Sequence, residues 1–191
     1  MILNIFGPSG SGKTTLVKEL LRNNKIITFF NNFTKEKYEK KISNKLSVSL
    51  IPLPKFRGTV KEFFNIFSID INILLSLEVE LNKLSESIFS KINDNNTLEK
   101  ISLREIETFS AGELRRLFIL KSLLVNSQLL IIDEPFSNSD RKLWNIIYKA
   151  INKKSRVIVL SHLSLQNLFG LDKKNISIDI SEVTKKFIID K

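Results

Sequence analysis

The chain has 191 residues, of which 42% are hydrophobic, enough for one globular domain with a buried core. It contains no cysteine and one histidine, which excludes disulfides, thiolate metal sites and multi-histidine metal clusters. The formal net charge of +10 permits binding to nucleic acid or to an anionic membrane surface. Because lysine greatly outnumbers arginine and no block of like charges stands out, we interpret most of this charge as solvated surface.

No stretch approaches the roughly 18 uninterrupted apolar residues of a membrane-spanning helix. The first residues run directly into a glycine-rich motif, without the basic segment or cleavage site of a secretory signal. We therefore expect a soluble, intracellular protein.

Strand and helix patterns alternate at the start of the chain. Residues 2–6 are apolar and β-prone, and apolar residues then recur at helical spacing from Leu16 to Leu21. Residues 26–30 form a second apolar run, which we interpret as a strand. Residues 46–51 form a third candidate strand, which ends at a proline-containing turn.

The middle of the chain is mostly helical. From Thr59 to about Asn96, a face that includes Val60, Phe63, Phe64 and Phe67 recurs at helical spacing and predicts a helical lobe. A further helix is expected from Ser110 to about residue 125.

The last third of the chain returns to alternation. Residues 129–132 predict a buried strand, 141–151 a helix, 156–160 a strand, and 176–180 a half-exposed edge strand. The final residues form a short strand or a tail. Strands that alternate with helices predict a parallel sheet covered on both faces.

Residues 7–14, Gly-Pro-Ser-Gly-Ser-Gly-Lys-Thr, form a P-loop motif between the first strand and its helix. In such a turn, backbone N–H groups at a helix N-terminus converge on phosphate oxygens. Lys13 should reach the β- and γ-phosphates, and the Thr14 hydroxyl should hold magnesium. The motif predicts a nucleotide site, but alone it does not separate ATPases from nucleotide kinases.

Two adjacent carboxylates, Asp133 and Glu134, follow the apolar run 129–132 and precede Pro135. The two carboxylates lie at the carboxyl end of the predicted strand, where open α/β sheets bind ligands. Asp133 would bind magnesium, and Glu134 would polarise the attacking water as a general base.

Ser110 and Glu113 have the spacing of a capping box, which needs no function beyond starting a helix. A helix start with Ser110 and Gly112 is also an anion site, so capping and phosphate contact are compatible. Four of the six glycines fall in this motif and the P-loop.

The order of these motifs, with Ser161-His162 after the last buried strand, resembles the nucleotide-binding subunit of ATP-binding-cassette (ABC) proteins over nearly the whole chain. Residues 110–113 resemble the family's signature motif, with Arg115-Arg116 just beyond it. Residues 137–140 (Ser-Asn-Ser-Asp) resemble the D-loop, and His162 the switch histidine.

The resemblance implies an α/β P-loop NTPase fold with a mostly parallel sheet flanked by helices and an inserted helical lobe. Its RecA-like core would cover about 1–58 and 118–191, and its helical subdomain about 59–117. The expected catalytic residues are Glu134, His162 and Lys13, and the expected metal ligands are Thr14 and Asp133. The expected ATP-binding residues are Gly7, Pro8, Ser9, Gly10, Ser11, Gly12, Lys13, Thr14, Thr15, Ser110, Gly112, Glu113 and Asp140.

The family pattern is incomplete in two places. An adenine-stacking aromatic residue is expected in an antiparallel β-region upstream of the P-loop, and this region is largely missing before Gly7. Residues 51–53 (Ile-Pro-Leu) and 58–62 resemble the surroundings of the family's Q-loop, but Leu53 stands where glutamine is expected.

The leading hypothesis is an ATPase subunit with ATP and Mg²⁺ as cofactors, which powers transport through a separate integral membrane permease. It would act as a homodimer, or as a heterodimer with another ABC subunit, in the cytoplasm at the inner face of the membrane. The alternatives are a soluble ABC ATPase that acts on nucleic acid or ribosomes and a weakly hydrolytic, nucleotide-gated module. A nucleoside-monophosphate kinase is a further alternative that only the P-loop supports, because such an enzyme needs no signature motif, no acidic pair at the strand end and no switch histidine.

Overall fold

The computed structural model describes residues 1–35, 46–50, 53–89, 98–137, 139–170 and 175–183. By their internal contacts the residues form two compact units. One unit comprises Met1–Ile51, Ser127–Pro135 and Lys154–Lys191, and the other comprises Pro52–Asn126 and Phe136–Lys153. We call the first the sheet unit and the second the helical unit.

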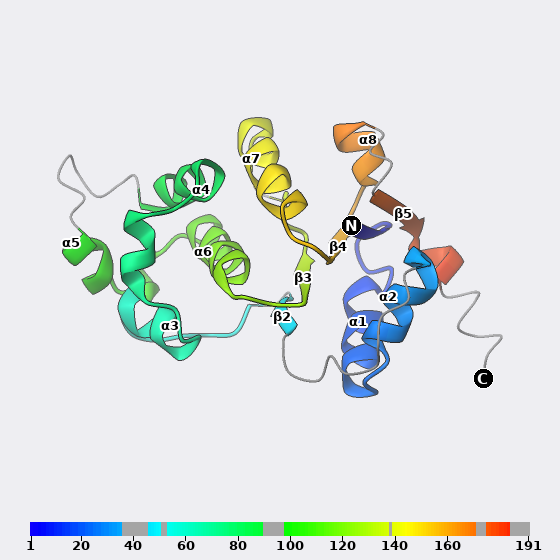
Figure 1. Ribbon diagram of the computed structural model, residues 1–191, viewed down its shortest axis with the longest axis horizontal. Coiled ribbons are helices and arrows are strands. Elements are labelled where there is room, and N and C mark those ends of the chain that lie inside the picture. The colour runs from blue at the N-terminus through cyan, green and yellow to red at the C-terminus, as the bar shows by residue number, and fades with distance from the viewer. Residues whose placement is uncertain (36–45, 51–52, 90–97, 138, 171–174, 184–191) are drawn as a thin grey trace. The chain divides into compact units, whose positions relative to one another are not determined.

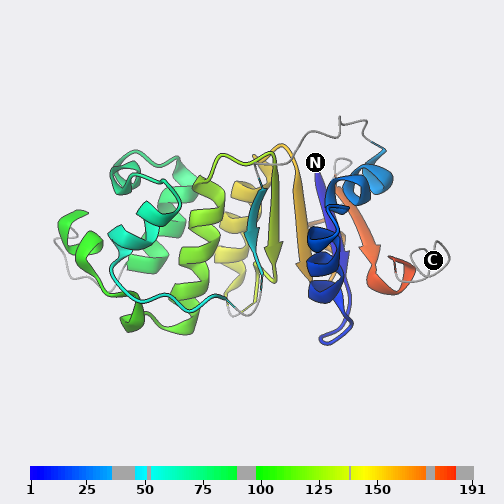
Figure 2. The same ribbon diagram turned by 90° about the horizontal axis from the view of Figure 1, so that it is seen from below.

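The sheet unit is built on five strands, which all pair in parallel in the order β2-β3-β4-β1-β5. Figure 2 shows them side by side in that order. The strands are β1 (Ile2–Phe6), β2 (Leu46–Ser49), β3 (Leu129–Asp133), β4 (Val157–Ser161) and β5 (Asn175–Asp179). All residues of β3 and β4 are buried, whereas the edge strands β2 and β5 are only partly buried. The mostly parallel sheet, the near-continuous apolar central strands and the partly exposed edge strand near residues 176–180 are thus confirmed.

The sheet packs against α1 (Lys13–Arg22) and α2 (Ile26–Thr34), which lie side by side in Figure 1. The strand predicted at 26–30 is wrong, because this segment is the start of α2. Ile26, Phe29 and Phe30 are buried at helical spacing in the core of the unit. A short apolar run fits either a strand or a buried helix, and here packing against β1 and α1 selects the helix. The sheet unit also contains α8 (Leu165–Phe169).

The helical unit is centred on phenylalanine packing around α6 (Ala111–Leu124). Phe63 lies edge-on to four rings, those of Phe56, Phe64, Phe67 and Phe118. Figure 1 shows α4 next to α6, and α4 also packs against α7. The other elements are α3 (Val60–Ile66), η1 (Ile71–Leu75), α4 (Val79–Phe89), α5 (Leu98–Leu103), η2 (Ile106–Thr108) and α7 (Arg141–Asn152).

The helical unit extends beyond the subdomain expected at 59–117. It includes the whole of α6 and α7, because α4 packs against both helices. The domain bounds given by the sequence stay a prediction. The end of the lobe near Asn96 and the tail at 184–191 lie outside the described residues. In the part of the chain that the structure describes, no helix has both the length and the apolar character needed to cross a membrane.

Candidate functional site

The P-loop lies at the carboxyl end of β1 and leads into α1. At its base, a Cβ on Gly7 would lie 2.6 Å from Cγ2 of the buried Ile180, so a larger residue has no room. At its end, Gly12 caps α1 with a left-handed φ of 90°, a conformation that glycine adopts without penalty. The first N–H groups of α1 have no acceptor within the helix, so they form a positive end suited to an anion.

Lys13 is almost buried, at 6% exposure, and its ammonium group lies inside the curve of the loop. Nζ donates hydrogen bonds to the carbonyls of Gly7 at 2.7 Å and Pro8 at 3.0 Å, and it lies 3.5 Å from the Ser11 hydroxyl. It is also 3.8 Å from Oε1 of Glu134. The loop therefore holds one fixed positive charge beside the end of β3.

Thr14 and Asp133, the two expected metal ligands, are in direct contact. Oγ1 of Thr14 donates a hydrogen bond to Oδ2 of Asp133 at 2.7 Å, although 119 positions separate them in the sequence. Asp133 is 5% exposed at the end of a fully buried strand. Within the described ranges no three His, Asp or Glu side chains gather as a metal cage. A hydroxyl and a carboxylate suit Mg²⁺, which takes few protein oxygens and completes its shell with phosphate and water.

Glu134 has a left-handed backbone, with φ of 49°, which is unusual for a residue other than glycine. Its N–H donates to the carbonyl of Leu160 at 2.8 Å, and this hydrogen bond ties the turn to β4. Its carboxylate is 14% exposed, 3.8 Å from Nζ of Lys13 and 3.5 Å from Nε2 of His162. Strained backbone of this kind concentrates at functional sites, where surrounding contacts enforce it.

His162 follows β4 directly and has a half-exposed imidazole. The structure thus brings Lys13, Glu134 and His162 together around one carboxylate oxygen. Among the residues expected to bind ATP in the P-loop, Pro8, Ser9, Gly10 and Gly12 are exposed, and Ser11 and Thr14 are partly buried. Thr15, which follows the loop, is exposed.

Sequence reasoning missed one residue close to this cluster. Asn4 lies in the middle of β1, is fully buried, and makes four side-chain hydrogen bonds. The available signal was a polar residue inside an otherwise apolar strand, because a buried amide needs hydrogen-bonding partners.

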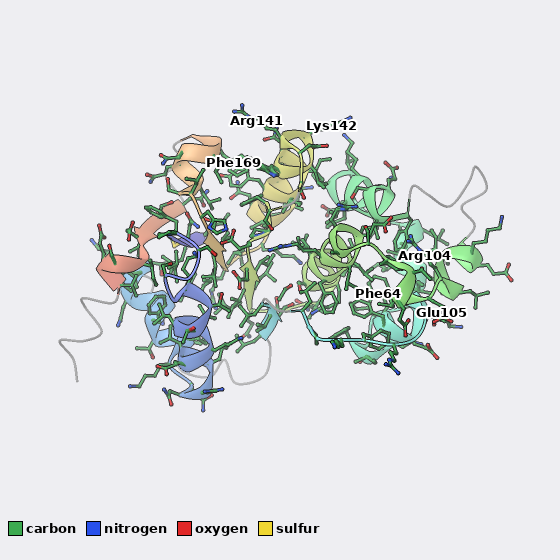
Figure 3. The ribbon with its side chains drawn as sticks, turned by 180° about the vertical axis from the view of Figure 1, so that it is seen from behind. Phe64, Arg104, Glu105, Arg141, Lys142 and Phe169 are labelled. Carbon is green, nitrogen blue, oxygen red and sulfur yellow. The ribbon has the colours of Figure 1, made fainter. Side chains whose placement is uncertain are left out.

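The signature residues lie in the helical unit, at the start of α6. The Ser110 side chain accepts a hydrogen bond from the Glu113 N–H, and the Glu113 carboxylate accepts from the Ser110 N–H at 2.9 Å, which completes a capping box. The same carboxylate lies 3.3 Å from Nη2 of Arg104, on the segment that leads into η2 (Figure 3). Ser110 is exposed and Gly112 partly exposed, whereas Glu113 is 3% exposed. Ser110 and Gly112 are therefore accessible, while Glu113 is engaged in building the helix start.

Described parts of two other predicted segments also belong to the helical unit. Asp140 caps α7, because its Oδ1 accepts from the Leu143 N–H at 2.8 Å. Asn138 in the same segment lies outside the described residues, as do positions 51 and 52 of the Q-loop-like segment. Leu53 is partly buried and belongs to no helix or strand. The roles predicted for these segments at a nucleotide site stay predictions.

The ABC transporter family model matches residues 1–137. The zinc import ATP-binding protein ZnuC of Wigglesworthia glossinidia brevipalpis is 31% identical over 171 residues, which cover 84% of this chain and 64% of that protein. The cytochrome c biogenesis ATP-binding export protein CcmA of Reclinomonas americana is 32% identical over 192 residues, which cover 96% of this chain and 80% of that protein.

A solved structure is also similar. It is a chain in the crystal structure of the complex of archaeal ribosomal stalk protein aP1 and archaeal ribosome recycling factor aABCE1. The TM-score is 0.54 at 27% identity, covering 85% of this chain and 33% of that one. The chain spans only 60–64% of the length of four ZnuC proteins that it matches. Its family model and its relatives nevertheless agree: the chain belongs to the ABC transporter family, with the ATP-binding subunits as its relatives.

Proposed function

We propose that the chain binds and hydrolyses ATP and thereby powers transport across a membrane through a separate permease. The observation that carries this proposal is the contact between Thr14 and Asp133 at 2.7 Å, with Glu134 next in sequence and within 3.8 Å of Lys13. The residues proposed to bind phosphate, to hold the metal and to act as the base therefore lie close together, which supports the proposal. The family match adds the expectation of ATP as the nucleotide.

The phosphates would lie at the N-terminus of α1. Backbone N–H groups of the loop would donate to phosphate oxygens, and Lys13 would exchange its carbonyl partners Gly7 and Pro8 for the β- and γ-phosphates. Gly10 and Gly12 suit this close approach, because both have a left-handed φ, of 74° and 90°, and neither carries a Cβ that would occupy the open space beside the loop.

Thr14 and Asp133 would hold Mg²⁺, the threonine hydroxyl directly and the carboxylate directly or through water. A Mg²⁺ ion held there would supply positive charge beside the phosphate oxygens. Both side chains are already oriented toward each other by their hydrogen bond, so little reorganisation is needed to share one ligand.

Glu134 would position the water that attacks the γ-phosphorus and would accept its proton. The new bond joins water oxygen to phosphorus, and the bond to the bridging oxygen of ADP breaks, so ADP and phosphate are released. Lys13 would stabilise the charge that develops on the phosphoryl oxygens. His162, 3.5 Å from Glu134, would orient this carboxylate and contact the γ-phosphate.

The signature residues would act on nucleotide held by a second subunit, in a homodimer or in a heterodimer with another ABC subunit. The accessible Ser110 and Gly112 at the start of α6 support this assignment, because they offer a hydroxyl and backbone N–H groups at a helix N-terminus. A subunit of this kind would bind at the cytoplasmic face of the membrane, on an integral permease.

Purification from native membranes tests the transport role. In detergent, the tagged chain should retain an integral membrane protein in stoichiometric amount. After reconstitution in lipid vesicles, that protein should raise the ATPase rate of the chain. The Glu134→Gln variant should retain the partner and lose turnover, whereas Glu19→Gln, an exposed carboxylate on α1, should behave like the unmodified chain.

A second candidate function is action on nucleic acid or ribosomes, which the net charge of +10 and the similarity to a chain in the aP1–aABCE1 complex favour. ATPase stimulation by RNA or ribosomes, with binding that weakens steeply as salt rises, would support it. If this stimulation occurs and no membrane partner is retained, the transport proposal is wrong.

A further inference from the structure

Asn4 is the most unusual residue of the sheet. It lies in β1, between β4 and β5, where parallel strands are covered on both faces and usually carry only apolar residues. Its side chain is fully buried, and a buried amide is costly unless its donors and acceptors are satisfied. The remaining residues of β1 are all apolar.

All the hydrogen-bonding positions of the Asn4 amide are filled. Nδ2 donates to the carbonyl of Val159 at 3.2 Å and to the hydroxyl of Ser161 at 2.8 Å. Oδ1 accepts from the Leu165 N–H at 2.9 Å and from the Ser177 hydroxyl at 3.3 Å. The orientation of the amide is fixed, because a carbonyl can only accept and an N–H can only donate.

Two of these partners, Ser161 and Leu165, lie on either side of His162 in the chain. The Ser161 hydroxyl accepts a hydrogen bond from Asn4 and donates one to the carbonyl of Leu163 at 2.6 Å. It thereby connects the residues directly before and after the histidine. Leu165 N–H, bound to Asn4 Oδ1, fixes the backbone just beyond. The Ser161 carbonyl accepts from the Gly7 N–H at 3.2 Å, which links the same turn to the P-loop.

We infer that Asn4, acting through the Ser161 hydroxyl, is a positioning residue that holds the backbone on both sides of His162 and so directs the imidazole at Glu134. The imidazole itself is half exposed and lies 3.5 Å from the Glu134 carboxylate. A residue with no contact to the nucleotide thus sets the geometry of the site. This inference rests on the proposed function only for its effect on turnover.

The single histidine of the chain makes a direct test possible, because the imidazole signals in an NMR spectrum of the full chain all belong to His162. Ser161→Ala removes the link from Asn4 to Leu163 with little change in volume. Ser177→Ala is the matched control, since it removes a hydroxyl from the same Asn4 oxygen on the β5 side, away from His162. Ser161→Thr retains the hydroxyl and serves as the conservative variant.

We expect Ser161→Ala to shift and broaden the His162 signals and to lower kcat for ATP hydrolysis at least tenfold, with a change in KM below twofold. Asn4→Leu should have the same effect where it folds. Ser161→Thr should retain the His162 signals and the kcat of the unmodified chain. Ser177→Ala should leave the His162 signals in place and should change kcat by less than twofold.

The inference is overturned if the His162 signals of Ser161→Ala match those of Ser177→Ala. The proposed function fails differently: in that case the unmodified chain would have no turnover, while the NMR comparison would still report on the positioning of His162.

Discussion

Thr14, in the first turn of α1, donates a hydrogen bond to Asp133, the last residue of β3, at 2.7 Å. Strand β4 lies between β1 and β3 in the sheet, so the contact reaches across one strand at the carboxyl edge. The two side chains that the sequence assigns separately to magnesium are therefore neighbours. The proposal that Thr14 and Asp133 bind the same magnesium ion can therefore be tested with single and double variants of these two residues.

Thr14→Val and Asp133→Asn should each weaken ATP binding at least tenfold in the presence of Mg²⁺, because the first removes the hydroxyl ligand and the second replaces the charged carboxylate by a neutral amide. In EDTA the same variants should differ from the unmodified chain by less than twofold. The double variant should lose less affinity than the product of the two single losses, since the effects of residues that share one ligand are not additive. Titration calorimetry with ATP, with and without the metal, measures these affinities.

Thr28→Ala, an exposed hydroxyl on α2, is the matched control for these variants. Equal losses in Mg²⁺ and in EDTA would contradict the metal assignment, because they would show that the hydroxyl and carboxylate act on the fold or on the phosphates alone.

The buried charge of Lys121 should lower the free energy of unfolding of the helical unit below pH 8. Its ammonium group is buried on α6 over the rings of Phe67 and Phe118, and burial lowers the pKa of Lys121 from its ordinary value of 10.5 to about 8. Below pH 8 the lysine is charged in both states, so folding bears the full cost of burying the charge. Between pH 8 and 10.5 only the folded lysine loses its proton, so stability rises with pH.

Lys121→Met should therefore raise the free energy of unfolding at pH 7 by about 1–3 kcal/mol. The difference from the unmodified chain should shrink as the pH approaches 10. Urea unfolding at several pH values measures this difference. Lys142→Met is the control, since Lys142 is exposed at the start of α7 (Figure 3) and should change stability little. A constant difference at every pH would contradict the charge-burial explanation.

Glu113 should matter for the stability of the helical unit. Glu113→Ala removes the capping-box partner of Ser110 and leaves Arg104 without this ion pair, so it should lower the free energy of unfolding by about 2–4 kcal/mol. Glu113→Gln keeps an oxygen for the Ser110 N–H and should cost about 1 kcal/mol. The exposed Glu99→Gln on α5 is the control. Equal losses for both Glu113 variants in urea unfolding would show that the charge of Glu113, and not the cap, dominates.

Periodicity and motif order were sufficient to predict most of the sheet unit, because the buried strands and the P-loop are encoded locally. The segment at 26–30 was mispredicted since a short apolar run has no period that separates a strand from a buried helix; only packing against α1 and β1 decides. The extent of the helical unit depends on the packing of α4 on α6 and α7, which local patterns do not contain.

The residues of the candidate site could be proposed from spacing, but their mutual geometry could not. The left-handed φ of Glu134 arises from the turn that joins β3 to the next segment, where its N–H binds Leu160 of β4. Likewise, Asn4 was visible only as a polar residue in an apolar strand. Its connection to His162 depends on the parallel register of β1 and β4.

The central claim, that this chain hydrolyses ATP with Glu134 as the base, is tested most directly by phosphate release from the purified chain and from Glu134→Gln. The unmodified chain should release phosphate from ATP in a Mg²⁺-dependent reaction. Glu134→Gln should lose at least 99% of this rate, an order-of-magnitude expectation for loss of a general base, while it still binds ATP and accumulates as an ATP-bound dimer. Turnover by Glu134→Gln within twofold of the unmodified chain would contradict the account.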